Sequence, residues 1–240
     1  MSTTAQQLDL PTINALLEKS EPARIVQWAV AQFAPDVVMS SSFGAESALL
    51  LHMSAAAMPG MRVVMVDTGY LFPETHAFME QLRERLKLDV HVYRSQIEPD
   101  QYLQQAGECD PTWRRDVEAC CAINKNEPFE RGIRELRPRA WLRGIRRDQA
   151  ATRQSRQIVE WSARFNCYAI SPLLNWGSRE IHAYMKQHDL PHHPLYEKGY
   201  ASIGCQPLSC TRPIQPGEDA RSGRWSGRGK LECGLHVEKQ

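Results

Sequence analysis

The chain has 240 residues, of which 42% are hydrophobic and 24% are charged, and its formal net charge is +1. This composition can bury a normal core, which excludes an intrinsically disordered chain, and the balance of charge gives no support for a general binder of nucleic acids or membrane surfaces. The most apolar stretch, residues 45–58, is interrupted by Glu46, His52 and Ser54, so it is too short and too polar to cross a bilayer. Residues 1–10 lack the basic and apolar regions of a signal peptide, and we therefore expect a cytoplasmic protein.

Hydrophobic periodicity predicts strands that alternate with helices. We expect a helix from residue 10 and further helices at 24–33, 45–57, 73–86 and 179–188, with strands at 36–39, 62–66, 89–93, 140–143 and 168–170. This alternation predicts an α/β fold with a mostly parallel sheet and helices on both faces, in which ligands bind beyond the carboxyl ends of the strands. We expect residues 1–35 to form an N-terminal helical segment, 36–198 the α/β domain and 199–240 an extended C-terminal segment, all in one globular unit.

Two of the predicted strands end in polar loops. Ser41 and Ser42 precede Gly44 at the start of a predicted helix, where backbone N–H groups can approach an oxyanion; a plain turn with serine caps is the alternative. Asp67 begins the second loop, where it or the nearby backbone would bind a ribose or a base edge; turn chemistry is again the alternative.

Basic residues are concentrated in two stretches. We interpret the two stretches together as sites for a small polyanion, with solvated surface charge as the alternative. They contain Arg143, Arg146, Arg147, Arg153 and Arg156 in the first stretch, and Arg212, Arg221, Arg224, Arg228 and Lys230 in the second.

Five of the seven cysteines form one layout: the adjacent pair Cys120 and Cys121, the pair Cys205 and Cys210, and the single Cys233. In a cytoplasmic protein such cysteines indicate metal binding or redox catalysis rather than disulfides. Neighbouring cysteines cannot close an unstrained disulfide, whereas the first four thiolates suit a tetrahedral metal ion or a [4Fe–4S] cluster. Small, buried, inert cysteines are the alternative.

The surroundings of Cys233 are different. It is followed by Gly234 and preceded by the second basic stretch, and cationic neighbours increase the thiolate fraction of a cysteine. We therefore predict a reactive thiol at Cys233, with an incidental cysteine as the alternative. Cys109 and Cys167 fit no pattern and are expected to be structural.

A series of motifs then occurs in the order found in one known family. They are SSFGAE at 41–46, DTG at 67–69 with LFPET at 71–75, CC at 120–121, GIRRDQ at 144–149, PL at 172–173, GYASIGC at 199–205, CTRP at 210–213, RSGRW at 221–225 and ECGLH at 232–236. With these motifs the chain resembles the assimilatory adenylyl-sulfate (APS) and phosphoadenylyl-sulfate (PAPS) reductases over nearly everything between about residues 36 and 236. The ECGLH motif is highly specific to this family, whereas a wider group of adenylating enzymes shares the serine loop.

The resemblance implies a fold related to the ATP pyrophosphatases (adenine-nucleotide hydrolase-like), with a nucleotide bound across the strand ends of the α/β domain. It also implies that the Cys233 thiolate attacks the sulfate sulfur of adenylyl sulfate, so that AMP leaves and an S-sulfocysteine forms. Thioredoxin or glutaredoxin then releases sulfite, in sulfate assimilation and cysteine biosynthesis. Such splitting of one difficult step into two agrees with covalent catalysis by a thiolate near cationic groups.

The same resemblance gives each candidate residue a role. Catalysis would rest on Cys233 and His236, and the [4Fe–4S] cluster on Cys120, Cys121, Cys205 and Cys210. The expected substrate contacts are Arg146, Arg221, Arg224 and His236 to the sulfate and phosphate, Ser41, Ser42, Phe43 and Leu71 to the adenylyl group, Asp67 to the ribose or base, and Lys125 to the cluster edge and the substrate.

The adjacent cysteine pair is a feature of the cluster-bearing APS branch and favours APS as substrate. The family has two residues between the second pair of cysteines, whereas four residues separate Cys205 from Cys210 here, so we expect a cluster that forms but is more labile. A second departure is Asn124, where the family often has Arg. Three alternatives stay open: a PAPS reductase with a degraded or absent cluster, a non-redox adenylating enzyme of the same superfamily, and a non-enzymatic metal-binding module. The oligomeric state is also open, with a homo-oligomer among the options.

Overall fold

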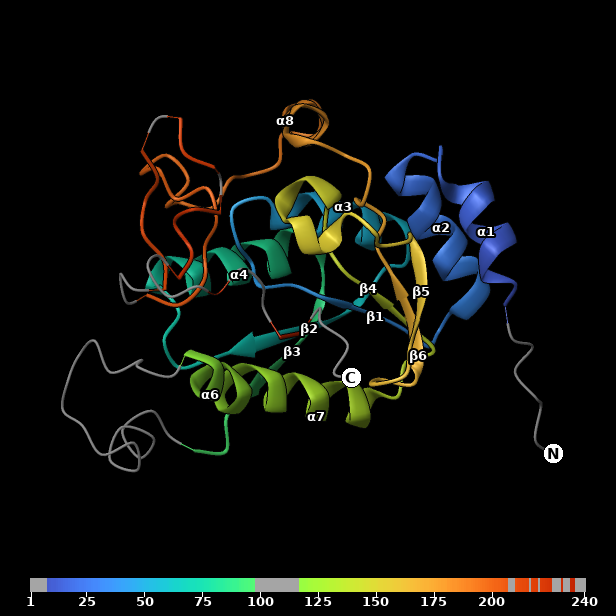
Figure 1. The fold of residues 1–240 in the computed structure, drawn as a ribbon, viewed down its shortest axis with the longest axis horizontal. Helices are drawn as coiled ribbons and strands as arrows, with labels where there is room; N and C mark the ends of the chain where they lie inside the picture. The colour runs from blue at the N-terminus through green and yellow to red at the C-terminus, as the bar shows by residue number, and fades with distance from the viewer. Residues whose placement is uncertain are drawn as a thin grey trace.

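A computed structural model describes residues 8–97, 117–206, 210–215, 217–219, 221–225, 230 and 234–235. Its centre is a six-stranded sheet in the order β3-β2-β1-β4-β6-β5 (Figure 1). The strands are β1 (Val37–Ser40), β2 (Arg62–Asp67), β3 (Asp89–Arg94), β4 (Ala140–Leu142), β5 (Val159–Ser162) and β6 (Cys167–Ile170). Each neighbouring pair is parallel except β5 with β6, which is antiparallel at one edge.

The helices follow the strands along the chain. They are α1 (Leu10–Leu17), α2 (Pro22–Phe33), α3 (Ser47–Ala57), α4 (Pro73–Leu86), α6 (Val117–Cys121), α7 (Glu127–Leu136) and α8 (Ser178–Gln187). A π-helix, η1 (Ala122–Asn126), joins α6 to α7, and two short 3-10 turns, η2 (Arg147–Gln149) and η3 (Ala151–Arg153), follow β4.

Local sequence explains several helix boundaries. Proline lies in the first turn of α2, α4 and α7, where its missing N–H has no intrahelical partner to lose. At their ends, α4 and α7 are followed by Lys87 and Arg137 in the left-handed conformation (φ 51° and 45°), which closes a helix by turning the chain away.

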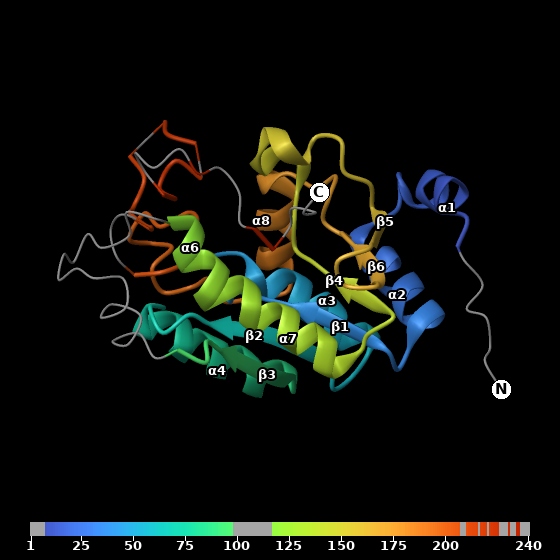
Figure 2. The same ribbon diagram turned by 60° about the horizontal axis from the view of Figure 1, so that its bottom comes forward.

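Side chains alternate between the two faces of the sheet and build two separate cores. Val37 and Met39 of β1 join the larger core, to which α1, α2, α3, α4 and α8 contribute. Val38, between them, joins the smaller core on the opposite face, together with Trp141 and with Phe129 of α7. Helices therefore cover both faces, with α7 alongside β2 and β3 (Figures 1 and 2).

The predicted fold class is confirmed, and the helices and strands expected from periodicity are present with shifts of a few residues at their ends. Periodicity missed β5, whose short run gains its partners only by folding back through Asn166 (φ 51°) onto β6. It also missed α7, which follows the π-helix. Among the residues described, no helix is long and apolar enough to cross a membrane.

His193 ties the segment after α8 to α4. Its Nδ1 accepts a hydrogen bond from the Leu195 N–H (3.1 Å), so its Nε2 carries the proton that is donated to the Thr75 hydroxyl (3.0 Å). The side chain is buried, and this burial lowers the pKa of His193 to about 4. The folded protein therefore holds this imidazole neutral at a pH where the unfolded chain would protonate it.

We expect acid to destabilise the protein through His193. Because the unfolded state binds the proton more readily, the free energy of unfolding falls as the pH drops from about 6.5 to about 4, with a slope of at most about 1.4 kcal/mol per pH unit from this group. Urea unfolding of wild type and His193→Gln across this range measures the effect. The variant should be less stable at neutral pH and should lose less stability on acidification. Parallel curves for the two proteins would exclude His193 as the titrating group.

Candidate active site

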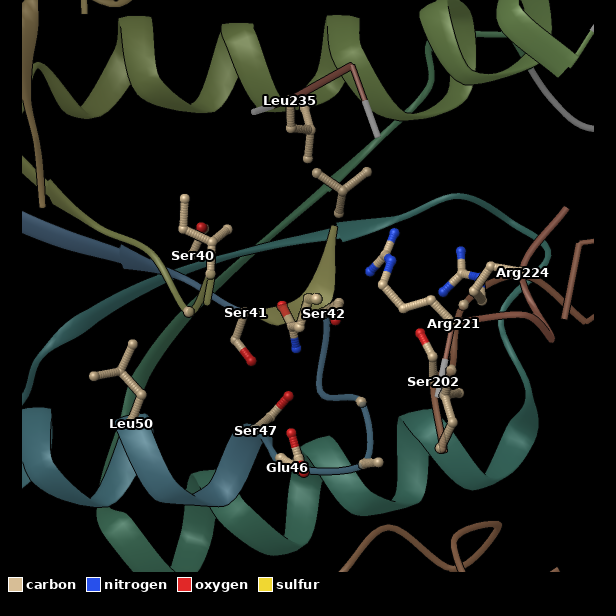
Figure 3. Close-up of a pocket in the computed structure, with 18 of the residues that line it drawn as sticks. Ser40, Ser41, Ser42, Glu46, Ser47, Leu50, Ser202, Arg221, Arg224 and Leu235 are labelled. Atoms are coloured by element: carbon tan, nitrogen blue, oxygen red, sulfur yellow. The ribbon is translucent and has the colours of Figure 1, made fainter. Parts of the chain in front are cut away.

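The chain reverses its direction across the sheet between β1 and β4. It runs from β1 outward to β2 and β3, and returns to β4 on the other side of β1. The loops that leave the carboxyl ends of β1 and β4 therefore diverge, and a cavity of about 250 Å³ lies between them. Figure 3 shows the serine loop and the start of α3 beneath this cavity, Arg221 and Arg224 at one side, and Leu235 above. We call it the arginine cavity.

The serine loop after β1 is held by a hydrogen bond to β2 and by a hydrogen bond within the loop. The Ser41 N–H donates to the Val64 carbonyl (3.1 Å), and the Phe43 N–H donates to the Ser41 hydroxyl (3.0 Å). Phe43 has a positive φ of 47°, and its side chain is fully buried in the larger core. Ser41 and Ser42 thus line the cavity, whereas Phe43 is not among its lining residues and anchors the loop in the core.

Asp67 shapes the loop after β2. Its buried carboxylate accepts hydrogen bonds from the Gly69 N–H (2.9 Å) and from Arg94 (2.8 Å). Asp67 is not among the residues that line the arginine cavity, whereas Leu71, further along the same loop, does line it. Leu71 also forms an antiparallel bridge with Cys205, which fixes the C-terminal segment against this loop.

Arg146, after β4, is a buried cation at the cavity wall. Its side chain is only 5% exposed. Its Nη1 lies 3.0 Å from Glu46 Oε2, and its Nε lies 3.1 Å from Asp148 Oδ1. Two carboxylates thus neutralise a charge that could not be buried alone. Arg146 also lines a neighbouring cavity of about 370 Å³, so it stands between the two spaces.

Arg221 and Arg224 approach from the C-terminal segment around the buried ring of Trp225. Their guanidinium carbons lie 6.0 Å and 4.7 Å from the ring centroid. Arg224 also donates from Nε to the Cys210 carbonyl (3.1 Å), and its guanidinium occupies the space that a side chain at Gly204 would need. The negative face of the indole thus attracts both guanidinium groups.

The other predicted arginines have different roles. Arg143 pairs with Glu160 and donates to the Ser171 hydroxyl. Arg147 pairs with Glu18 and donates to the Arg156 carbonyl. Arg212 pairs with Glu218, and its hydrogen bond lowers the pKa of Glu218 to about 2. Arg228 lies outside the described residues. In the first basic stretch, Arg146 and Arg153 line the arginine cavity, and in the second stretch Arg221 and Arg224 do so.

The four cysteines predicted as ligands gather around a third, much smaller cavity of about 20 Å³, which we call the cysteine cavity. Cys120 and Cys121 come from the end of α6, and Cys205 and Cys210 from the C-terminal segment. The Thr68 hydroxyl lies 3.3 Å from the Cys205 sulfur, and the Asn124 amide donates to the Cys120 sulfur over 3.7 Å. The π-helix η1 follows directly and places Asn124 and Lys125 on the wall, consistent with the frequent use of π-helical turns at functional sites.

These cysteines do not form a site for a single metal ion. Within the described ranges, no three His, Cys, Asp or Glu side chains are grouped closely enough for one ion. A [4Fe–4S] cluster has a different requirement, because each thiolate binds its own iron and the sulfurs surround a volume rather than a point. The donor set of four cysteines around one cavity, with hydrogen-bond donors near two sulfurs, fits that requirement in its chemistry.

The arginine cavity and the cysteine cavity share a wall. Five residues line both of them: Thr68, Lys125, Cys205, Arg224 and Trp225. Cys233 and His236 lie outside the described residues. The two residues between them in the chain, Gly234 and Leu235, are described, and Leu235 lines the arginine cavity. Cys167 is fully buried in the smaller core, as expected for a structural cysteine, and Cys109 lies outside the described residues.

Several residues of the site belong to the quoted motifs or to the first basic stretch but were not among the expected substrate contacts or metal ligands. Glu46 is part of a predicted motif, but its pairing with Arg146 depends on how two distant loops meet. Gln149, which ends the GIRRDQ motif, lines the cavity from the short turns after β4, as does Arg153, which was predicted only as part of a basic stretch. Trp225 lies directly after Arg224, and an aromatic residue within a basic run was the available signal for its role.

The chain is similar to known proteins over most of its length. The family model described as "Phosphoadenosine phosphosulfate reductase domain" matches residues 36–213. The chain is 37% identical to the adenosine 5'-phosphosulfate reductase of Salinibacter ruber, over 96% of this chain and 90% of that protein. It is 42% identical to the phosphoadenosine 5'-phosphosulfate reductase of Xylella fastidiosa (strain M12), over 95% of this chain and 94% of that protein. The names of its relatives thus include both substrates.

Solved structures agree with this fold. The phosphoadenylyl-sulfate reductase from Candida auris, in a phosphate complex, has a TM-score of 0.72 and 25% identity, and the match covers 85% of this chain and 98% of that one. The FMN adenylyltransferase of Candida glabrata shares only the fold, with a TM-score of 0.58 and 16% identity over 91% of this chain and 70% of that one. The matches support the predicted oxidoreductase acting on a sulfur group in sulfate assimilation. The chain belongs to the phosphoadenosine phosphosulfate reductase family.

Proposed function

We propose that this protein is a thioredoxin-dependent adenylyl-sulfate reductase, which converts APS into sulfite and AMP through an S-sulfocysteine on Cys233. Its main support is the wall shared by the two cavities. Four cysteines suited to a cluster lie directly behind the arginines suited to a phosphosulfate, with Lys125 and Arg224 facing both spaces. A structural role for the four cysteines alone would not require this placement.

The chemistry needs one thiol of this chain and two thiols of a donor. The Cys233 thiolate attacks the sulfur of the sulfate group, a new S–S bond forms, and the bond between sulfur and the phosphate oxygen breaks as AMP leaves. A thiolate of thioredoxin, or of glutaredoxin, then attacks the Cys233 sulfur and expels sulfite. The second thiol of the donor closes the donor disulfide and regenerates the Cys233 thiolate, so the donor supplies both electrons.

The residues of the arginine cavity fit the charge that the first step moves. Arg146, Arg221 and Arg224 would bind the phosphosulfate and stabilise the negative charge that develops on the leaving phosphate, with His236 as a proposed further contact. Ser41, Ser42 and Leu71 would contact the adenylyl group. For Asp67 and Phe43, whose side chains are bonded or buried away from the cavity, we propose a role in holding the loops that make these contacts.

A [4Fe–4S] cluster on Cys120, Cys121, Cys205 and Cys210 would supply structure and electrostatic support beside Lys125. Electron transfer through it is not needed, because thiols carry both electrons. One observation keeps PAPS as a second candidate substrate: proteins named for it are as similar to this chain as those named for APS. Comparing kcat/KM for APS and PAPS tests the choice, and a preference for PAPS would overturn the proposed substrate.

The cluster can be tested by composition. We expect about four iron and about four acid-labile sulfide per chain after anaerobic purification, with the brown absorbance of a [4Fe–4S] centre. Cys210→Ala should lose this centre, whereas Cys167→Ala, which removes a buried cysteine of the smaller core, should keep it. Metal content well below one cluster per chain in the wild type would count against the cluster and favour the second candidate.

The nucleophile can be tested by substitution. We expect Cys233→Ser to abolish sulfite release from APS, because a hydroxyl cannot form the S-sulfocysteine, while AMP binding stays within about twofold of the wild type, since the arginines remain. Intact mass of the protein after APS treatment without thioredoxin should show the added SO₃ on the wild type but not on the variant. Unchanged turnover in the variant would exclude the proposed mechanism.

The placement of Arg224 can be tested without changing its charge. A Cβ at Gly204 would overlap the Arg224 guanidinium, so Gly204→Ala should displace this flexible cation and raise the KM for APS about tenfold or more, in line with a lost charge-assisted hydrogen bond. Gly144→Ala is the matched control in the same cavity, because its Cβ would lie 3.7 Å from Leu50, an ordinary contact. Equal effects of the two substitutions would contradict the assignment of Arg224 to the substrate.

A further inference from the structure

Gly234 and Leu235 are docked on the body of the protein by groups far away in the chain. Arg164, in the turn between β5 and β6, donates from Nη1 to the Gly234 carbonyl over 2.6 Å. The two residues are separated by 70 positions. The contact therefore joins the proposed catalytic segment to an edge of the sheet.

Arg164 is itself rigidly placed. Its side chain is only 10% exposed, and it pairs with Glu130 of α7 through Nε (3.0 Å) and Nη2. Its guanidinium also lies 5.0 Å from the centroid of the Phe165 ring, which packs edge-on against Phe129 and Trp141 of the smaller core. An arginine fixed by a carboxylate and an aromatic ring has little rotamer freedom left to lose when it binds a carbonyl.

Two further contacts complete the docking. A Cβ at Gly234 would lie 2.7 Å from the Asn126 side-chain amide, so Gly234 packs closely against the end of the π-helix and no larger residue fits without movement. Leu235 packs against both the smaller core and the cluster of Val117, Cys210 and Trp225. In Figure 3 its side chain points into the arginine cavity from the side opposite the serine loop.

We propose that Arg164 is a positioning residue for the first step of the reaction. Cys233 directly precedes Gly234 in the chain, and consecutive Cα atoms are only about 3.8 Å apart, so a contact that holds the Gly234 carbonyl would limit the freedom of the nucleophile next to it. Arg164 is not among the residues that line the arginine cavity, so it acts through the chain and not on the substrate. This inference rests on the proposed function, in which Cys233 is the nucleophile.

The experiment compares Arg164→Gln with Arg131→Gln. Arg131 is a matched control, because it also pairs with a carboxylate (Glu127, 2.9 Å), donates to a backbone carbonyl (Arg94) and lies 5.7 Å from an aromatic ring (Tyr93). None of its contacts involves Gly234. Both substitutions remove the same kind of interactions, so a general loss of stability should appear in both proteins.

Single-turnover kinetics with APS is the main measurement. Formation of the S-sulfocysteine, followed by intact mass, should slow about tenfold or more in Arg164→Gln, because the nucleophile is less well confined. The affinity for AMP and the rate at which thioredoxin releases sulfite from preformed S-sulfocysteine should stay within about twofold of the wild type. Arg164→Lys, which keeps one charged donor, should recover part of the rate.

Hydrogen exchange of the peptide that contains Gly234 and Leu235 provides a readout independent of activity. This exchange should rise in Arg164→Gln and not in Arg131→Gln. Equal exchange in the two variants, or equal losses in the first step, would reduce Arg164 to a structural residue and overturn the inference. If the wild type forms no S-sulfocysteine but the exchange differs as expected, the docking contact stands and the proposed function has failed.

Discussion

The parallel pairing of β1 with β4 determines where the functional groups of this molecule lie. These two strands leave the sheet toward loops that diverge, since the chain has already crossed to β2 and β3 before it returns. The space between the loops can be closed only by segments from elsewhere, and the C-terminal segment supplies Ser202, Gly204 and Arg224. The same segment brings Cys205 and Cys210 to the end of α6, so one topological feature places both cavities.

Buried positive charge is the energetic problem that this arrangement creates. A guanidinium removed from water is destabilising unless other groups replace its hydration. Arg146 is buried and is compensated by two carboxylates, whereas the half-buried Arg224 rests on the face of a buried indole, which attracts it without neutralising its charge. The second solution leaves more positive potential available to an anionic substrate. Fixed cations of this kind stabilise developing negative charge without reorganising during the reaction, which is the general advantage of a preorganised site.

The sequence predicted the strands that carry the site better than the contacts between its side chains. Short apolar runs predicted β1, β2 and β4, and thereby the loops that line the arginine cavity, because strands buried on both faces of a sheet are apolar along their length. Local pattern could not separate Arg146, which lines the cavity, from Arg143, three residues earlier, which pairs with Glu160 at the far edge of the sheet. Nor could it relate Arg164 to Gly234, because that contact depends on the position of the turn between β5 and β6 in the folded protein. Contacts between residues that are distant in the chain leave no local pattern, so periodicity cannot predict them.

The two steps of the proposed reaction would place opposite demands on the segment that carries Cys233. The first step needs the thiolate confined against the substrate, whereas the second needs the same sulfur exposed to a protein thiol. The charge-assisted hydrogen bond from Arg164 and the partial burial of Leu235 would each contribute on the order of 1–3 kcal/mol to docking, and the entropy cost of ordering these residues opposes them. The net free energy of docking would then be small, so that an undocked state stays available to the proposed donor without a separate trigger. Docking by many strong contacts would favour the first step at the expense of the second, so the few contacts of Gly234 and Leu235 suit a cysteine that is proposed to serve both.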